Sequence, residues 1–128
     1  ASFERQVQQV DDGVCVVWLP GRPGHDWQAA VRWLLQVAPA PATLSCDPDP
    51  AGIQIAMTAG ALWDEAGLSW HAAHMEPQRW LDGPTRPLTA YDLRTLQALA
   101  SSPLPTELAT LRDALLHNQC KAEQEGWL

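Results

Sequence analysis

The sequence predicts one α/β domain with a mainly parallel sheet flanked by helices, and three observations support this fold class. Apolar, strand-like segments at 14–19, 42–46 and 68–74 alternate with segments of helical character at 26–37 and 50–66. This β-α-β-α-β order is typical of parallel sheets covered by helices. The length of 128 residues suits one domain, and a hydrophobic content of 46% is sufficient for a packed core.

The first strand is predicted from a continuous apolar run, Val14–Leu19, which is typical of strands buried on both faces. Pro20–Gly24 ends this run, and Asp26 is then a candidate N-cap for a helix through Val37. The apolar residues of that helix recur at helical spacing: Trp27, Ala30, Val31, Leu34 and Leu35. We also expect Trp33 in the core.

The second helix, from about Pro50 to Ala66, is apolar almost all round and therefore expected to be well buried. Gly67 suits the position just after its C-terminus. Two later helices are predicted at 89–100, capped by Thr89, and at 106–126, capped by Thr106. The inner stripe of the last helix is expected to contain Leu108, Leu111, Leu115 and Ala122.

The net charge of −7 disfavours a domain that binds nucleic acid by itself, because phosphate neutralisation needs a basic face. Three widely spaced cysteines form no zinc-binding pattern, and we expect reduced thiols in a cytoplasmic protein. No apolar run approaches the ~20 residues that span a bilayer. Because the chain starts at Ala1 rather than Met, we interpret it as part of a longer protein.

The most informative segment is Cys-Asp-Pro-Asp-Pro-Ala-Gly at 46–52, directly after the second predicted strand. Ligands of parallel α/β sheets bind outside the carboxyl ends of strands, where Asp47 and Asp49 can reach one hard cation. A purely structural interpretation has equal weight for Asp49, a good N-cap before Pro50. That interpretation leaves Asp47 unexplained.

The order of strand, Asp-x-Asp-x-x-Gly and helix resembles the second motif of Toprim domains, which occur in topoisomerases, primases and topoisomerase VI-type double-strand-break enzymes. The fuller similarity is to a bacterial group related to the A subunit of topoisomerase VI, which includes the Toprim nuclease subunit of the Wadjet plasmid-defence system. The corresponding segments cover nearly the whole chain: Val14–Leu19, Asp47–Gly52, His74-Met75, Leu88-Thr89 and Glu123-Gln124-Glu125.

The resemblance implies that 1–128 is a single Toprim-like, Rossmann-like domain at the C-terminal end of a DNA-processing protein. It implies that Asp47 and Asp49 are catalytic and hold Mg²⁺ or Mn²⁺ for phosphodiester chemistry. DNA would be reached through the full-length protein, and partner proteins are possible.

The sequence departs from this family at the end of the first predicted strand. Family members carry a Glu there that acts as general acid/base or third metal ligand, whereas this chain has Trp18 or Leu19. Another acid would have to substitute, and the candidates are Asp26, Glu76 and, as our choice for a catalytic residue, Glu125. The alternative is a catalytically inactive Toprim-like interaction module.

Two further alternatives concern other side chains. A phosphatase of the haloacid dehalogenase type also uses Asp-x-Asp, but on its first strand and followed by a Gly-Thr-like pair, so it ranks lowest. Trp18, Trp80 and Trp127 are possible base-stacking residues, although core or interface packing is the better interpretation. Arg79 and Arg86 are the basic residues that we expect nearest to a phosphate.

Overall fold

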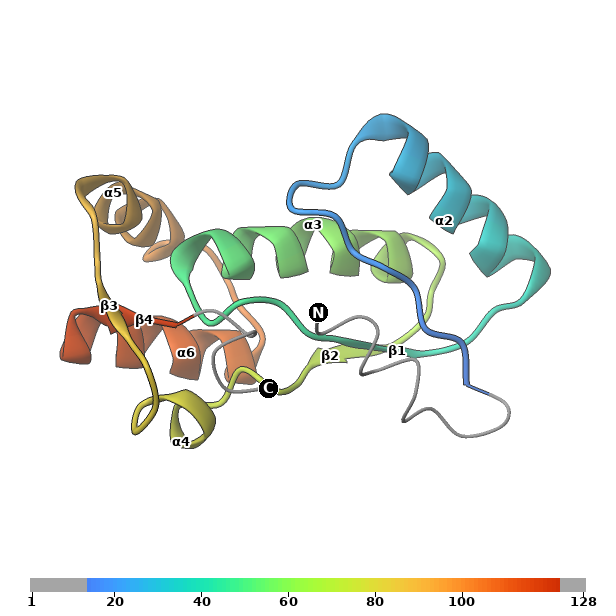
Figure 1. Cartoon of the computed structure of the whole chain (residues 1–128). Helices are drawn as coiled ribbons and strands as arrows, with labels where there is room; N and C mark the ends of the chain where they lie inside the picture. Colours follow the sequence, from blue (N-terminus) through green and yellow to red (C-terminus); the bar gives the residue numbers. More distant parts are fainter. Residues whose placement is uncertain (1–13, 123–128) are drawn as a thin grey trace.

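The computed structural model describes residues 14–122, and within them the chain forms five helices and two small sheets (Figure 1). The elements follow in the order α2 (His25–Val37), β1 (Ala42–Leu44), α3 (Pro50–Glu65), β2 (Trp70–Ala72), α4 (Pro77–Trp80), β3 (Arg86–Pro87), α5 (Ala90–Leu99), α6 (Thr106–Asn118) and β4 (Cys120–Lys121). The α/β class predicted from the sequence is thus present. None of these helices combines the length and apolarity that a membrane crossing requires.

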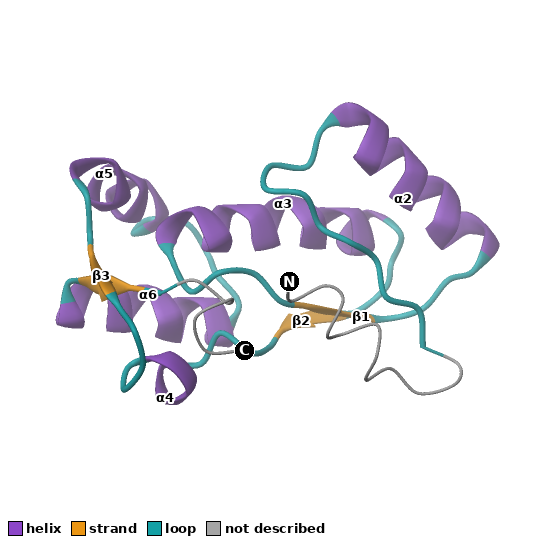
Figure 2. Cartoon of the chain, in the orientation of Figure 1, coloured by secondary structure: helices purple, strands orange, loops and turns teal. Residues whose placement is uncertain are grey.

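The larger elements build on one parallel strand pair. β1 and β2 pair in parallel, with Ala42 opposite Trp70 and Leu44 opposite Ala72, which confirms the predicted adjacency of these two segments. α3 runs along this pair and connects its two strands, and Figure 2 shows α2 lying beyond α3. β3 and β4 form a separate antiparallel pair near α5 and α6.

The predicted first strand is wrong: residues 14–19 form no strand. Val14 and Trp18 are 60% and 65% exposed, and the carbonyl of Trp18 accepts a hydrogen bond from the indole of Trp27. The segment lines a groove of about 420 Å³ beside β1 without pairing with it. An apolar, β-branched run favours a strand but supplies no partner, and pairing requires a neighbouring backbone in register.

α3 lies at the centre of the molecule and contributes to both groups of buried side chains. Val31 and Leu35 of α2 pack against Leu62 and Trp63, which lie near the C-terminal end of α3. The larger group joins α3 to the remaining elements: Cys46, Ile53, Ala56, Ala72, Met75, Trp80, Leu96, Leu99, Leu108, Leu111, Leu115 and Ala122. Trp33, which we expected in the core, is 63% exposed because it lies on the outer side of α2.

Helix termini follow the sequence closely in some places and not in others. Asp49 caps α3, Thr89 caps α5 in a reciprocal capping box with Asp92, and Gly67 has the expected positive φ of 72°. The caps predicted for α2 and α6 are wrong, since Gly24 and Pro105 occupy those positions without a side-chain cap.

The last helix is also shorter than predicted. It ends at Asn118, where Gln119 adopts a left-handed conformation with φ 55°. The chain then enters β4, which pairs with β3. Ala122 is buried as expected, but it lies beyond β4 rather than on the helix.

Candidate functional site

The acidic segment lies between the C-terminal end of β1 and the N-terminus of α3. The Asp49 carboxylate accepts a hydrogen bond of 2.6 Å from the Gly52 backbone N–H, which is the N-cap bond of α3. The Asp49 N–H in turn donates to the Asp47 carbonyl at 2.8 Å. These two bonds fold the segment into a tight turn that carries both carboxylates.

Gly52 makes this turn possible. A Cβ built at this position would overlap the backbone carbonyl oxygen of Asp47 and would lie 3.1 Å from the Asp49 carboxylate. The Asp-x-Asp-x-x-Gly spacing therefore has a steric basis, because only glycine lets the turn close against the helix. Asp49 and Gly52 both have structural roles, whatever else the segment does.

Negative charge is concentrated at this turn. Burial, together with the nearby carboxylates of Asp47 and Asp92, raises the pKa of Asp49 to about 6. The hydrogen bond from Gly52 and the positive charge of Lys121 act in the opposite direction but do not cancel this rise. Asp49 is thus a partly buried carboxyl group with an acidic neighbour on each side.

Asp92 is the acid near the site that sequence reasoning missed. Its side chain is 5% exposed and forms an ion pair with Lys121, the only lysine of the chain, at an N–O distance of 2.7 Å. Burial alone would raise the pKa of Asp92, but the hydrogen bonds from Lys121 and Thr89 outweigh burial and lower it. In the sequence, Asp92 is recognisable only as the third helical residue after the N-cap Thr89. That position gives no sign that α5 packs against α3.

β4 brings Lys121 to the acidic turn. The Ala122 N–H donates to the carbonyl of Pro48, between the two aspartates, at 3.3 Å. β4 is held in place by its pairing with β3, in which Lys121 lies opposite Arg86. The C-terminal part of the chain therefore contributes to the surroundings of the Asp-x-Asp segment.

The other candidates for a third acid are not at this site or lie outside the described residues. Asp26 is exposed in the first turn of α2. Glu76 precedes α4 and forms an exposed ion pair of 3.2 Å with Arg79. Glu125 belongs to the residues that the structure does not describe. Arg86 takes part in β3 and is exposed.

Cys46 is not suited to nucleophilic chemistry, although it directly precedes Asp47. It is 6% exposed, and burial together with the charges of Asp47 and Asp49 raises the pKa of its thiol to about 12. The thiolate is the reactive form of cysteine, and it is not populated near neutral pH at such a pKa.

Within residues 14–122, no three His, Cys, Asp or Glu side chains are arranged as a ready group of metal ligands. Asp47 and Asp49 are the two carboxylates of the turn, and the neighbouring Asp92 of α5 is paired with Lys121. This donor set fits Mg²⁺ or Mn²⁺ in the usual protein mode, in which one or two carboxylates act with water and substrate phosphates. It does not fit a closed structural site, which needs more protein ligands.

The raised pKa of Asp49 predicts that stability falls as pH rises from about 4 to about 6. The unfolded carboxyl has a pKa of 3.8 and the folded one about 6, so the folded state binds the proton more tightly in this window. The stabilisation is complete below the unfolded value and lost above the folded value, by an amount on the order of 3 kcal/mol.

Urea unfolding at several pH values measures this effect as the difference between the wild type and Asp49→Asn. Asparagine is also a good N-cap and carries no charge, so the variant should be the more stable protein at pH 7. If the difference in stability between the two proteins is the same at pH 4 and at pH 7, the assignment of the raised pKa to Asp49 is wrong.

No family model matches this chain, and a search of curated proteins found no match either. Function is therefore inferred from the site and from the sequence motif. Because residues 14–19 form no strand, the Asp-x-Asp segment follows the first strand of the described chain. One reason against a haloacid dehalogenase-type site is thereby removed, and the Pro50-Ala51 pair after the motif remains the other.

Proposed function

We propose that this chain is a Toprim-like domain of a DNA-processing protein and that Asp47 and Asp49 hold Mg²⁺ or Mn²⁺ for phosphodiester chemistry. The observation that carries the proposal is the placement of two neighbouring carboxylates at the carboxyl end of a parallel strand, one of them with its pKa raised to about 6. Ligands of parallel α/β sheets bind at this edge. A divalent cation would offset the repulsion between the two groups.

The bound cation would supply charge stabilisation at a phosphate oxygen. Asp47 and Asp49 would orient it, and Gly52 would keep the turn that carries them in place. The net charge of −7 makes the domain a poor DNA-binding unit alone, so DNA contacts are assigned to the full-length protein.

We include Glu125 as the third acid of the proposed site. Ala122 is hydrogen-bonded to Pro48 within the acidic segment. The sequence resemblance alone supports Glu125, which lies outside the described residues. The other two candidates belong to other parts of the fold: Asp26 lies in the first turn of α2, and Glu76 directly precedes α4.

A catalytically inactive Toprim-like module that binds partner proteins is the second candidate. One observation favours it: large apolar side chains are exposed on α2 and on the segment before it, namely Val14, Val17, Trp18, Trp33 and Val37. Exposed apolar side chains are a feature of protein interaction sites where they form one continuous patch. Trp18 or Leu19 also stands where the resembled family has its Glu.

The Asp47→Asn variant is expected to be as stable as the wild type without metal, or more stable, because one repelling charge is removed. Its affinity for Mn²⁺ should fall roughly tenfold or more, since a neutral amide replaces a carboxylate ligand. Thermal melts over a range of Mn²⁺ concentrations measure both quantities, because a ligand that binds only the folded state raises the melting temperature.

Asp82→Asn is the matched control, since Asp82 is an exposed loop acid away from the turn. It should leave the Mn²⁺ affinity unchanged, whereas Glu125→Gln should weaken it if Glu125 is the third ligand. A loss of stability in metal-free Asp47→Asn with an unaltered Mn²⁺ response would mean that Asp47 is only a turn residue. The inactive module would then be the better description.

A further inference from the structure

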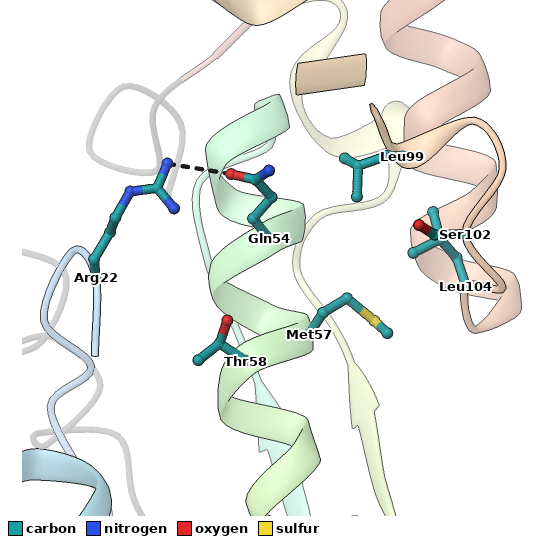
Figure 3. Close-up of a pocket in the computed structure, with 7 residues that line it drawn as sticks. All are labelled: Arg22, Gln54, Met57, Thr58, Leu99, Ser102 and Leu104. Carbon is teal, nitrogen blue, oxygen red and sulfur yellow. Dashed lines mark hydrogen bonds between the residues drawn. The ribbon is translucent and has the colours of Figure 1, made fainter. Parts of the chain in front are cut away.

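A cavity of about 390 Å³ opens on the outer face of α3, between the loop before α2 and the segment that joins α5 to α6. Figure 3 shows Arg22 reaching Gln54 from one side, with Leu99, Ser102 and Leu104 on the other side of the same stretch of α3. This volume is in the range of pockets that bind small molecules. We call it the Arg22 cavity.

Arg22 is held in position by neutral groups. Its Nη2 donates to the Gln54 side-chain oxygen at 3.2 Å and to the Tyr91 hydroxyl at 2.9 Å. The residue is flanked by Gly21 and Pro23, and a following proline restricts the backbone to extended conformations. The guanidinium is therefore oriented before any ligand arrives.

The charge of Arg22 is not neutralised by an acid of the described chain. Arg32, Arg79 and Arg112 each form an ion pair with a carboxylate, whereas both partners of Arg22 are uncharged. Among the described residues, no Asp or Glu lines the cavity. A guanidinium has five N–H donors, and Gln54 and Tyr91 use only those of Nη2. Donors on Nε and Nη1 remain for an anionic group.

The rest of the cavity suits an apolar body with few polar contacts. Met57, Leu99 and Leu104 provide carbon surface away from Arg22, and Thr58 and Ser102 provide hydroxyl groups. Leu99 is 7% exposed and belongs to the main core, so this wall is anchored in the core. Three apolar and four polar residues line the cavity, so it offers carbon surface beside one oriented charge and a few hydroxyl and amide groups.

We propose that the Arg22 cavity binds a small molecule that carries one phosphate or carboxylate group on a short apolar body. The anionic group lies against Arg22, and the body extends across Met57 toward Leu99 and Leu104. The site is separate from the Asp47–Asp49 turn and requires no metal ion. Phosphate and carboxylate share the chemistry that Arg22 recognises.

Two-dimensional NMR of the 128-residue chain, without divalent cations, tests this assignment with four probes: hexyl phosphate, heptanoate, inorganic phosphate and hexanol. Hexyl phosphate or heptanoate should shift the signals of Thr58, Leu99 and Leu104. The tighter of these two should bind roughly tenfold more strongly than inorganic phosphate and hexanol, because each of those supplies only half of the interaction. Which of the two anions binds better identifies the preferred group.

Arg22→Gln should weaken binding of the preferred probe by roughly tenfold or more, the effect of losing a hydrogen bond to a charged group. Arg94→Gln is the matched control, since Arg94 is an exposed arginine of α5 that does not line the cavity. Leu104→Ser should weaken the binding of hexyl phosphate or heptanoate and leave the affinity for inorganic phosphate unchanged. Equal effects of the two arginine variants, or shifts confined to residues outside the cavity, would overturn the proposal.

Discussion

Replacing Gly52 with alanine is expected to lower the free energy of unfolding by about 3–4 kcal/mol. The new Cβ would overlap the Asp47 carbonyl oxygen, and a backbone atom cannot move aside as the end of a side chain can. To make room, the turn must open, and the capping bond from Gly52 to Asp49 is then lost, which costs about 1 kcal/mol within that total. Urea unfolding monitored by tryptophan fluorescence measures the difference.

Gly21→Ala is the matched control for this substitution. Apart from its chain neighbours, no atom of the described residues lies within 4 Å of a Cβ built on Gly21, and its φ is not positive. The change should therefore stay within about 0.5 kcal/mol. The proposed metal site adds a second readout, because an opened turn separates Asp47 from Asp49. If Gly52→Ala is as stable as Gly21→Ala, the close approach of helix and turn is wrong.

The Trp80→Ala variant is expected to lose about 3–5 kcal/mol, the usual range for deletion of a buried tryptophan. Trp80 is completely buried in the main core, and its indole N–H donates to the Met75 carbonyl at 3.1 Å. The substitution leaves a large cavity and an unpaired buried carbonyl, and both effects destabilise the folded state.

Trp18→Ala provides the comparison, because Trp18 is 65% exposed and the hydrogen bond from Trp27 goes to its backbone carbonyl. That variant should lose less than about 1 kcal/mol. Thermal and urea unfolding of both variants also separate the two roles considered for the tryptophans. If Trp80→Ala costs as little stability as Trp18→Ala, Trp80 is not a core residue, and stacking on a base is again a candidate role for it.

The features that the sequence predicted correctly depend on neighbours along the chain. Asp49, Pro50 and Gly52 determine where α3 begins, and Gly67 marks the residue after its C-terminal cap. Thr89 similarly sets the start of α5. These signals hold because an N-cap bond joins residues three apart and a positive φ is a property of one residue.

The features that the sequence did not predict depend on contacts between distant segments. Asp92 and Lys121 are 29 positions apart, and only the packing of α5 and the pairing of β4 with β3 bring them together near Asp49. The orientation of Arg22 likewise depends on Gln54 and Tyr91, from two different helices. No local pattern encodes such distances.

The sequence by itself determined the α/β class and the acidic turn between β1 and α3, which follow from hydrophobic periodicity and local bonding. It also indicated the parallel pairing of β1 with β2, through the order strand, helix, strand. The tertiary structure decided that residues 14–19 stay unpaired and that a lysine lies beside the acids. The physical reason is that a strand exists only when another backbone satisfies its hydrogen bonds, and a charge is neutralised only by the groups that the fold places around it.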